Sequence, residues 1–196
     1  METNNYLFSK LNVSLSASYK NSYLKKFSIL IIFISICFSS FSQNKSPNFE
    51  RYIQTYKDWA IYHMNKYKIP ASITLAQAIL ESGAGTSHLA VHGNNHFGIK
   101  DKPEWKGEVL TNPNDGELYR KYDSIQKSYL DHSLFLTQRS WYKPLFQLEI
   151  TDYRGWAIGL QKIGYAVDKE YPQKLIRIIE TYQLYLYDQG LVADQY

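Results

Sequence analysis

The residue best suited to catalysis in this sequence is Glu81, which lies near the end of an apolar helix pattern. The surrounding run, residues 75–90, reads LAQAILESGAGTSHLA, and Gly83 is a typical residue for ending a helix. A helix C-terminus is electronegative and the neighbouring apolar side chains desolvate a carboxyl group, so both effects raise its pKa. A carboxylic acid that stays protonated near neutral pH can protonate a glycosidic oxygen. Spacing alone favours a solvated helix-end glutamate, because Glu is common in helices.

Three histidines, His88, His92 and His96, recur every four residues and suggest a metal-binding helix face. Gly93 is expected to break the helix before His96, and a zinc site needs at least three converging ligands. His132 falls on the apolar side of a predicted helix, which is typical of a buried structural histidine. The sequence has no HExxH, P-loop, GxSxG or glycine-rich dinucleotide turn, so we expect neither a metal nor a cofactor.

Apolar residues at helical spacing predict the elements that must position Glu81. Predicted helices begin at Phe49, Pro70, Ser87, Asp123 or Ser124, Thr151 or Asp152, and Asp168. Pro70 is expected at the first position of its helix, where proline fits, and Gly83 just past its end. The last helix is expected to extend from Asp168 through Leu186.

Residues 94–122 have a different pattern, with Gly and Pro residues between short strand-like runs. This composition predicts an irregular lobe of two or three β-strands, with a hairpin turn at Asn114-Asp115-Gly116. The predicted fold class is therefore α+β, mostly helical, with a small β-lobe inserted after the helix that carries Glu81.

Two motifs in a fixed order carry a resemblance to a known family. They are AQAxLESGxG, residues 76–85, and NNxFGIK, residues 94–100. Further matches are Trp105-Lys106-Gly107, Arg120-Lys121-Tyr122-Asp123-Ser124, Asp131-His132 and Trp156-Ala157. Over residues 50–187 the chain resembles the bacterial N-acetylglucosaminidases of the flagellar-hydrolase and autolysin type, glycoside hydrolase family seventy-three.

The resemblance implies a lysozyme-like domain over residues 49–190, with a groove between two lobes and Glu81 as the general acid. Tyr122 matches a tyrosine that faces the reacting sugar in such enzymes, where it stabilises positive charge or orients the N-acetyl group. The residues expected to shape the substrate groove are Asn94, Asn95, Phe97, Gly98 and Trp105. Gly98 permits close approach of chain or sugar, and Trp105 either stacks on a pyranose ring or packs within the lobe.

The second catalytic group is expected in the β-lobe, where four carboxylates compete: Glu104, Glu108, Asp115 and Glu117. We favour Glu117, because it precedes the predicted strand that leads to Tyr122. A carboxylate far across the groove leaves room for a water molecule and predicts inversion at the anomeric carbon. If no carboxylate is near, the N-acetyl group of the substrate is expected to act as the nucleophile.

The first 42 residues are typical of a secretory signal peptide, and residues 43–48 of a polar linker. Two lysines precede an apolar run of 12 residues, 27–38, and serines follow it at the positions of a cleavage site. The run is too short to remain as a membrane-spanning anchor. The single cysteine, Cys37, follows Ile36, which is too large for lipoprotein processing, so no lipid anchor is expected either.

The positive charge of the whole chain comes largely from this leader. Four of the 22 basic residues and one of the 18 acidic residues lie in residues 1–42, so the rest of the chain carries about +1 instead of +4. A near-neutral domain without cysteine does not support nucleic-acid binding or disulfide formation.

These features together predict an exported peptidoglycan hydrolase that cleaves the β-1,4 glycan backbone as an endo-β-N-acetylglucosaminidase. The expected partner is the peptidoglycan glycan strand, the expected state is a monomer, and the expected location is the periplasm, the cell envelope or the medium. Two alternatives stay open: a lytic transglycosylase or muramidase on a related fold, and a non-catalytic peptidoglycan-binding module.

Overall fold

The computed structural model describes residues 45–190, so the expected signal peptide lies outside the described residues. Helix α2 (Pro47–Tyr67) begins two residues before the predicted start, and the end of the expected linker is therefore helical. Pro47 suits this position, because a proline in the first helical turn gives up no backbone hydrogen bond. Within residues 45–190, no helix is both long and apolar enough to cross a membrane.

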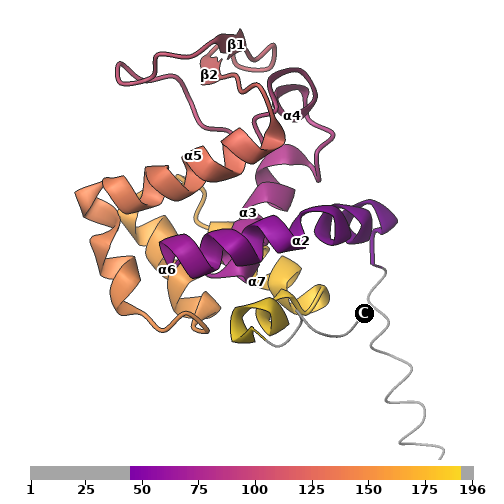
Figure 1. The fold of residues 1–196 in the computed structure, drawn as a ribbon, viewed down its shortest axis with the longest axis vertical. Helices are drawn as coiled ribbons and strands as arrows, with labels where there is room; N and C mark the ends of the chain where they lie inside the picture. The colour runs from indigo at the N-terminus through magenta and orange to yellow at the C-terminus, as the bar shows by residue number, and fades with distance from the viewer. Residues whose placement is uncertain (1–44, 191–196) are drawn as a thin grey trace, which may run out of the picture. The chain divides into compact units, whose positions relative to one another are not determined.

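Helix α3 (Ala71–Ser82) forms the centre of the core and carries Glu81 near its end. All residues from Ala71 to Ile79 are buried, as expected for a helix that is surrounded by others. Its neighbours are α2, α6 (Tyr153–Ile163), α7 (Tyr171–Thr181) and η2 (Leu184–Gln189). Figure 1 shows α3 behind α2. Pro70 lies just before the helix, one position earlier than predicted, and Gly83 ends it with a φ of 57°.

The β-lobe follows α3 as predicted. It consists of α4 (His88–Gly93) and an antiparallel hairpin of β1 (Val109–Thr111) and β2 (Leu118–Arg120), with Leu110 opposite Tyr119. Gly116, with a φ of 72°, permits the turn between the strands. Figure 1 shows the hairpin above α5 (Ile125–Gln138) and beside α4. The predicted class, mostly helical α+β with a small β-lobe, is confirmed.

The helix caps after the β-lobe follow the sequence closely. The side chain of Ser124 accepts a hydrogen bond from the amide of Lys127 at the start of α5, and Asp152 accepts one from the amide of Gly155 at the start of α6. A 3-10 helix, η1 (Ser140–Gln147), lies between them and was not predicted. Its short length and internal proline leave little apolar periodicity in the sequence.

The prediction of a single last helix from Asp168 through Leu186 is wrong. Asp168 accepts a hydrogen bond from the amide of Glu170 in a turn, and α7 starts only at Tyr171. The helix ends at Thr181, because Gln183 takes a left-handed conformation with a φ of 55°. The remaining apolar residues form the 3-10 helix η2, which packs against α3.

Candidate active site

A cavity of about 830 Å³ borders Glu81. The end of α3 forms one side, the NNxFGIK segment contributes Phe97 and Gly98, and residues 164–174 before and within α7 form the other side. Three of the predicted site residues, Glu81, Phe97 and Gly98, therefore line one cavity, although Glu81 is on α3 and the other two follow α4. The cavity is large enough to hold sugar units.

The Glu81 carboxyl is partly buried at the C-terminal end of α3. Burial raises its pKa above the ordinary range, and a hydrogen bond with the Tyr171 hydroxyl opposes this rise. The net direction is upward, so the carboxyl stays protonated to a higher pH than a solvated glutamate. This is the property that a general acid requires.

Gly98 brings the main chain close to this carboxyl. A Cβ added to Gly98 would lie 3.9 Å from Oε2 of Glu81, and the φ of this glycine is +60°. Glycine adopts this left-handed conformation without strain, whereas a residue with a Cβ atom adopts it at a cost in free energy. The expected close approach at Gly98 is therefore an approach to Glu81.

The two asparagines of the second motif do not line the cavity of Glu81, and their side chains bind the main chain instead. Asn95 is fully buried, and its side chain donates hydrogen bonds to the carbonyls of Ile99 and Arg120 at 2.9 and 2.8 Å. Asn94 donates to the carbonyl of Tyr122 at 2.8 Å. These contacts tie the loop that carries Gly98 to the β-lobe.

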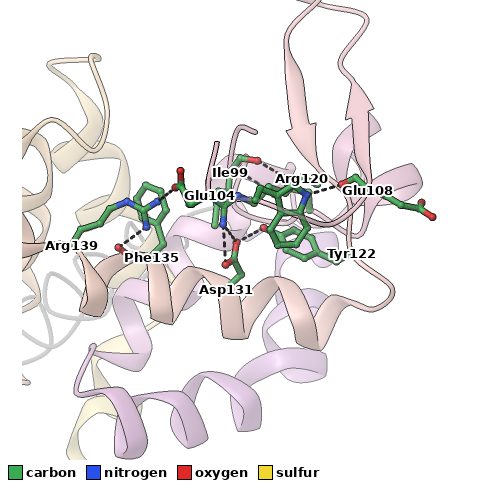
Figure 2. Close-up of polar contacts among 10 residues, drawn as sticks. Ile99, Glu104, Glu108, Arg120, Tyr122, Asp131, Phe135 and Arg139 are labelled. Atoms are coloured by element: carbon green, nitrogen blue, oxygen red, sulfur yellow. Dashed lines mark hydrogen bonds and ion pairs between the residues drawn. The ribbon is translucent and has the colours of Figure 1, made fainter. Parts of the chain in front are cut away.

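Tyr122 and Trp105 lie together, but in a second cavity of about 300 Å³ whose lining does not include Glu81. Their rings meet edge to face at 5.4 Å, and the Tyr122 hydroxyl donates to Asp131 at 2.7 Å. Figure 2 shows Asp131 accepting from both Tyr122 and Arg120. Burial and the Asp131 charge raise the pKa of Tyr122, so it remains a neutral donor.

None of the four β-lobe carboxylates lines the cavity of Glu81 in the described part of the chain. Glu104 is held by Arg120 and Arg139 at 3.1 and 2.6 Å (Figure 2). Glu108 pairs with Lys121, and Asp115 accepts from the Tyr119 hydroxyl at 2.7 Å. Glu117 is exposed and pairs at 3.5 Å with Lys100, which does line the cavity.

The histidine spacing does not gather a metal site among residues 45–190. His88 and His92 lie side by side, with ring centroids 4.6 Å apart. His96 points elsewhere, and its Nδ1 lies 2.5 Å from the buried Tyr52 hydroxyl. Helix α4 includes Gly93 and is capped by Asn94, whose φ of 49° is left-handed, so the break before His96 falls one residue later than the sequence predicted.

Several residues of the Glu81 cavity were missed from the sequence. Tyr165 and Tyr171 line it from the side of α7, together with Asp168 and Lys174, which pair with each other at 2.6 Å. Tyr171 was treated as part of a helix pattern, because nothing in its local spacing connects it to a residue 90 positions earlier. Only the packing of α7 against α3 makes that connection.

Comparison with known proteins identifies the family of this chain. The profile of the family described as mannosyl-glycoprotein endo-beta-N-acetylglucosaminidase matches residues 57–184, and the chain belongs to this family. It is 40% identical over 139 residues to the exo-glucosaminidase LytG of Bacillus subtilis, covering 63% of this chain and 48% of that protein. It is 32% identical over 126 residues to the peptidoglycan hydrolase FlgJ of Salmonella typhimurium, covering 57% and 39%.

The fold is shared with solved structures of the same kind. The catalytic domain of the autolysin Auto from Listeria monocytogenes superposes with a TM-score of 0.61 at 26% identity, covering 76% of this chain and 92% of that one. The predicted lysozyme-like architecture is thereby confirmed. The chain spans about half or less of the length of the two relatives above.

Proposed function

We propose that this protein hydrolyses the glycan backbone of peptidoglycan, with Glu81 as the general acid. The observation that supports it most directly is a carboxyl with a raised pKa beside a cavity of about 830 Å³. Glu81 would donate its proton to the glycosidic oxygen as the bond to the anomeric carbon breaks. The bond is expected to be the β-1,4 linkage that follows N-acetylglucosamine.

For the second group we retain Glu117 among the β-lobe carboxylates. Among residues 45–190 its ion-pair partner is Lys100, which is itself exposed, and such an ion pair contributes little and separates easily. Glu104 is held by two arginines, and Glu108 faces the other cavity. If Glu117 does not take part, the N-acetyl group of the substrate is the proposed nucleophile.

Tyr122 and Trp105 are proposed to contact sugar units further along the strand. Both line the second cavity, and Trp105 is only partly buried, so its ring is accessible for stacking. Phe97, Gly98, Asn94 and Asn95 are proposed to shape the groove at Glu81. The proposed place of action is outside the cytoplasm. The expected signal peptide favours export, and a relative named as a peptidoglycan hydrolase favours a substrate in the cell wall.

The test is digestion of purified peptidoglycan sacculi, followed by mass spectrometry of the soluble products. We expect new reducing ends at N-acetylglucosamine, and a loss of about 10²- to 10⁴-fold in the rate of their release for Glu81→Gln. Glu149→Gln, which changes an exposed glutamate outside both cavities, is the matched control. Unchanged release by Glu81→Gln would contradict the proposal, and an anhydro-muramic end would indicate a lytic transglycosylase.

A test of the second group compares Glu117→Gln with the native protein on a soluble glycan fragment. If Glu117 activates water, Glu117→Gln cleaves more slowly than the native protein, and the first anomer that the native protein forms, observed by NMR, has inverted configuration. If the N-acetyl group reacts, Glu117→Gln keeps its activity and the first-formed anomer is retained.

A further inference from the structure

A chain of buried polar side chains from three helices lies behind Glu81. Gln77 is on α3, one turn before Glu81, Tyr171 is on α7 and His132 is on α5. Gln77 and His132 are fully buried, and Tyr171 is only 3% exposed. The Gln77 amide nitrogen donates to the Tyr171 hydroxyl at 3.0 Å, and its carbonyl oxygen lies 3.1 Å from Nε2 of His132.

In this chain of side chains, each hydrogen bond is donated in the direction of Glu81. The carbonyl oxygen of Gln77 can only accept, so Nε2 of His132 carries the hydrogen. Because the Tyr171 oxygen accepts from Gln77, its own hydrogen is available for the hydrogen bond with the Glu81 carboxyl. The order of donation is therefore His132 to Gln77, Gln77 to Tyr171, and Tyr171 to Glu81.

The far end of the chain is fixed by packing. The His132 ring stacks on Phe97, with centroids 4.0 Å apart and planes 13° apart, and Phe97 itself lines the cavity of Glu81. Burial lowers the pKa of His132 to about 3, so the ring is neutral at neutral pH. Its Nδ1 has no hydrogen-bond partner within the described residues, which agrees with a bare nitrogen.

Such a chain is costly as a purely structural device. Each of these polar groups loses water on burial, and apolar side chains of similar size would fill the same space without that loss. A fully connected chain instead specifies one arrangement of its members. Its last member, Tyr171, lines the same cavity as the carboxyl that the proposed function uses, and its hydroxyl lowers the pKa of that carboxyl.

We propose that Tyr171, Gln77 and His132 are positioning residues that hold the Glu81 carboxyl in one orientation toward the cavity. The inference rests on the proposed role of Glu81. It extends that role to two residues, Gln77 and His132, that do not touch the cavity. Apart from Glu81, the titratable groups that line the cavity are Lys100, Lys102, Tyr165, Asp168, Tyr171 and Lys174, and His63 acts on His132.

The first test is the pH profile of kcat for Tyr171→Phe. We expect kcat to fall about 10- to 100-fold with little change in KM, because the carboxyl is less well oriented. The Tyr171 hydroxyl lowers the pKa of Glu81, so its loss should move the alkaline limb of the profile to higher pH. A residue that only stabilises the fold would leave this limb in place.

The other two positioning residues are tested by Gln77→Met and His132→Phe. The second variant keeps an aromatic ring stacked on Phe97. Both should move the alkaline limb in the same direction as Tyr171→Phe, with decreasing size along the chain. Tyr129→Phe is the matched control, because it removes a buried hydroxyl that donates to Tyr52 and does not contact Glu81. It should leave the limb unchanged.

A measurement on the native protein covers the case in which a variant fails to fold. The ¹⁵N NMR signals of His132 should show a protonated Nε2 and a bare Nδ1 at pH 7. A protonated Nδ1, or an unmoved alkaline limb in a folded Tyr171→Phe variant, overturns the inference. If Glu81→Gln stays active, the proposed function is wrong. The NMR measurement of His132 still tests whether the hydrogen bonds from His132 to Tyr171 run in the inferred direction.

Discussion

The carboxylate of Asp188 accepts two hydrogen bonds from Ser72, one from the backbone amide at 2.8 Å and one from the hydroxyl at 2.6 Å. Ser72 is in the first turn of α3, and Pro70 before that helix offers no side-chain cap. Asp188 therefore supplies, from η2 and 116 residues away, the cap that α3 lacks locally. The helix that carries Glu81 is thus held at its start by the C-terminal end of the domain.

Removing this cap should destabilise the domain. Asp188→Ala leaves buried amide groups of α3 without an acceptor, and we expect the free energy of unfolding to fall by about 2 kcal/mol. Urea denaturation measures this change. An exposed aspartate that caps locally, Asp152, gives the comparison: Asp152→Ala should cost about 1 kcal/mol. If the two variants lose the same free energy of unfolding, the burial of Asp188 does not increase the contribution of this cap to stability.

Asp188 should also give the stability a pH dependence. Burial raises its pKa from 3.8 to about 6, so the native state holds a proton on Asp188 more tightly than the unfolded state does. The stability that comes from this proton is fully present below about pH 4 and is lost as the pH rises through 6. Asp188→Asn does not titrate. Relative to the native protein, this variant should therefore become more stable as the pH rises from 4 to 7. A constant difference across that range would contradict the assignment.

The sequence predicted those site residues whose role is evident from a single helix or a single motif. Glu81 and Gly83 follow from the apolar period of α3 and its glycine stop, and Gly98 follows from its motif. Asp188 and Tyr171 were not recognised, because their roles arise from contacts with α3 over roughly 90 to 116 residues of sequence. An aspartate within an apolar run of tyrosines and leucines was the one available signal for Asp188.

Gly98→Ala should damage both stability and activity. The φ of +60° makes any side chain costly here, by about 1–2 kcal/mol, and the new methyl group would contact Oε2 of Glu81 at 3.9 Å. Gly190→Ala is the control, since its φ is +67° and nothing lies within 4 Å of its added Cβ. Both variants should lose similar stability in urea, while only Gly98→Ala loses activity on sacculi. Full activity in Gly98→Ala would mean that the close approach to Glu81 is unimportant.

His96 should make the domain less stable in acid. Burial lowers its pKa from 6.5 to about 4, so its stabilising contribution is present above pH 6.5 and is lost as the pH falls toward 4. The loss is about 3 kcal/mol, and the similarly buried His132 adds to it. His96→Gln should flatten the dependence of unfolding free energy on pH between 4 and 6.5. His92→Gln, which replaces an exposed histidine, should keep the native slope.

Arg120 should contribute more to the stability of the β-lobe than any exposed ion pair. Its side chain is 5% exposed and contacts both oxygens of Asp131 at 3.1 and 3.0 Å (Figure 2). Its guanidinium carbon also lies 4.9 Å from the centre of the Trp105 ring. Arg120→Ala leaves the Asp131 carboxylate without its cation, and we expect a loss of about 3–5 kcal/mol. Arg120→Lys keeps the charge but not the paired contact, so it should lose less.

The same network predicts a coupling between Arg120 and Tyr122, because both donate to Oδ2 of Asp131. In a double-mutant cycle, Arg120→Lys and Tyr122→Phe should be non-additive by about 1 kcal/mol in urea denaturation. Glu108→Gln breaks the exposed pair with Lys121 and serves as the comparison, with little measurable change expected. Additive losses at Arg120 and Tyr122 would show that Asp131 holds the two side chains independently, and Tyr122 would then not depend on Arg120 for its orientation.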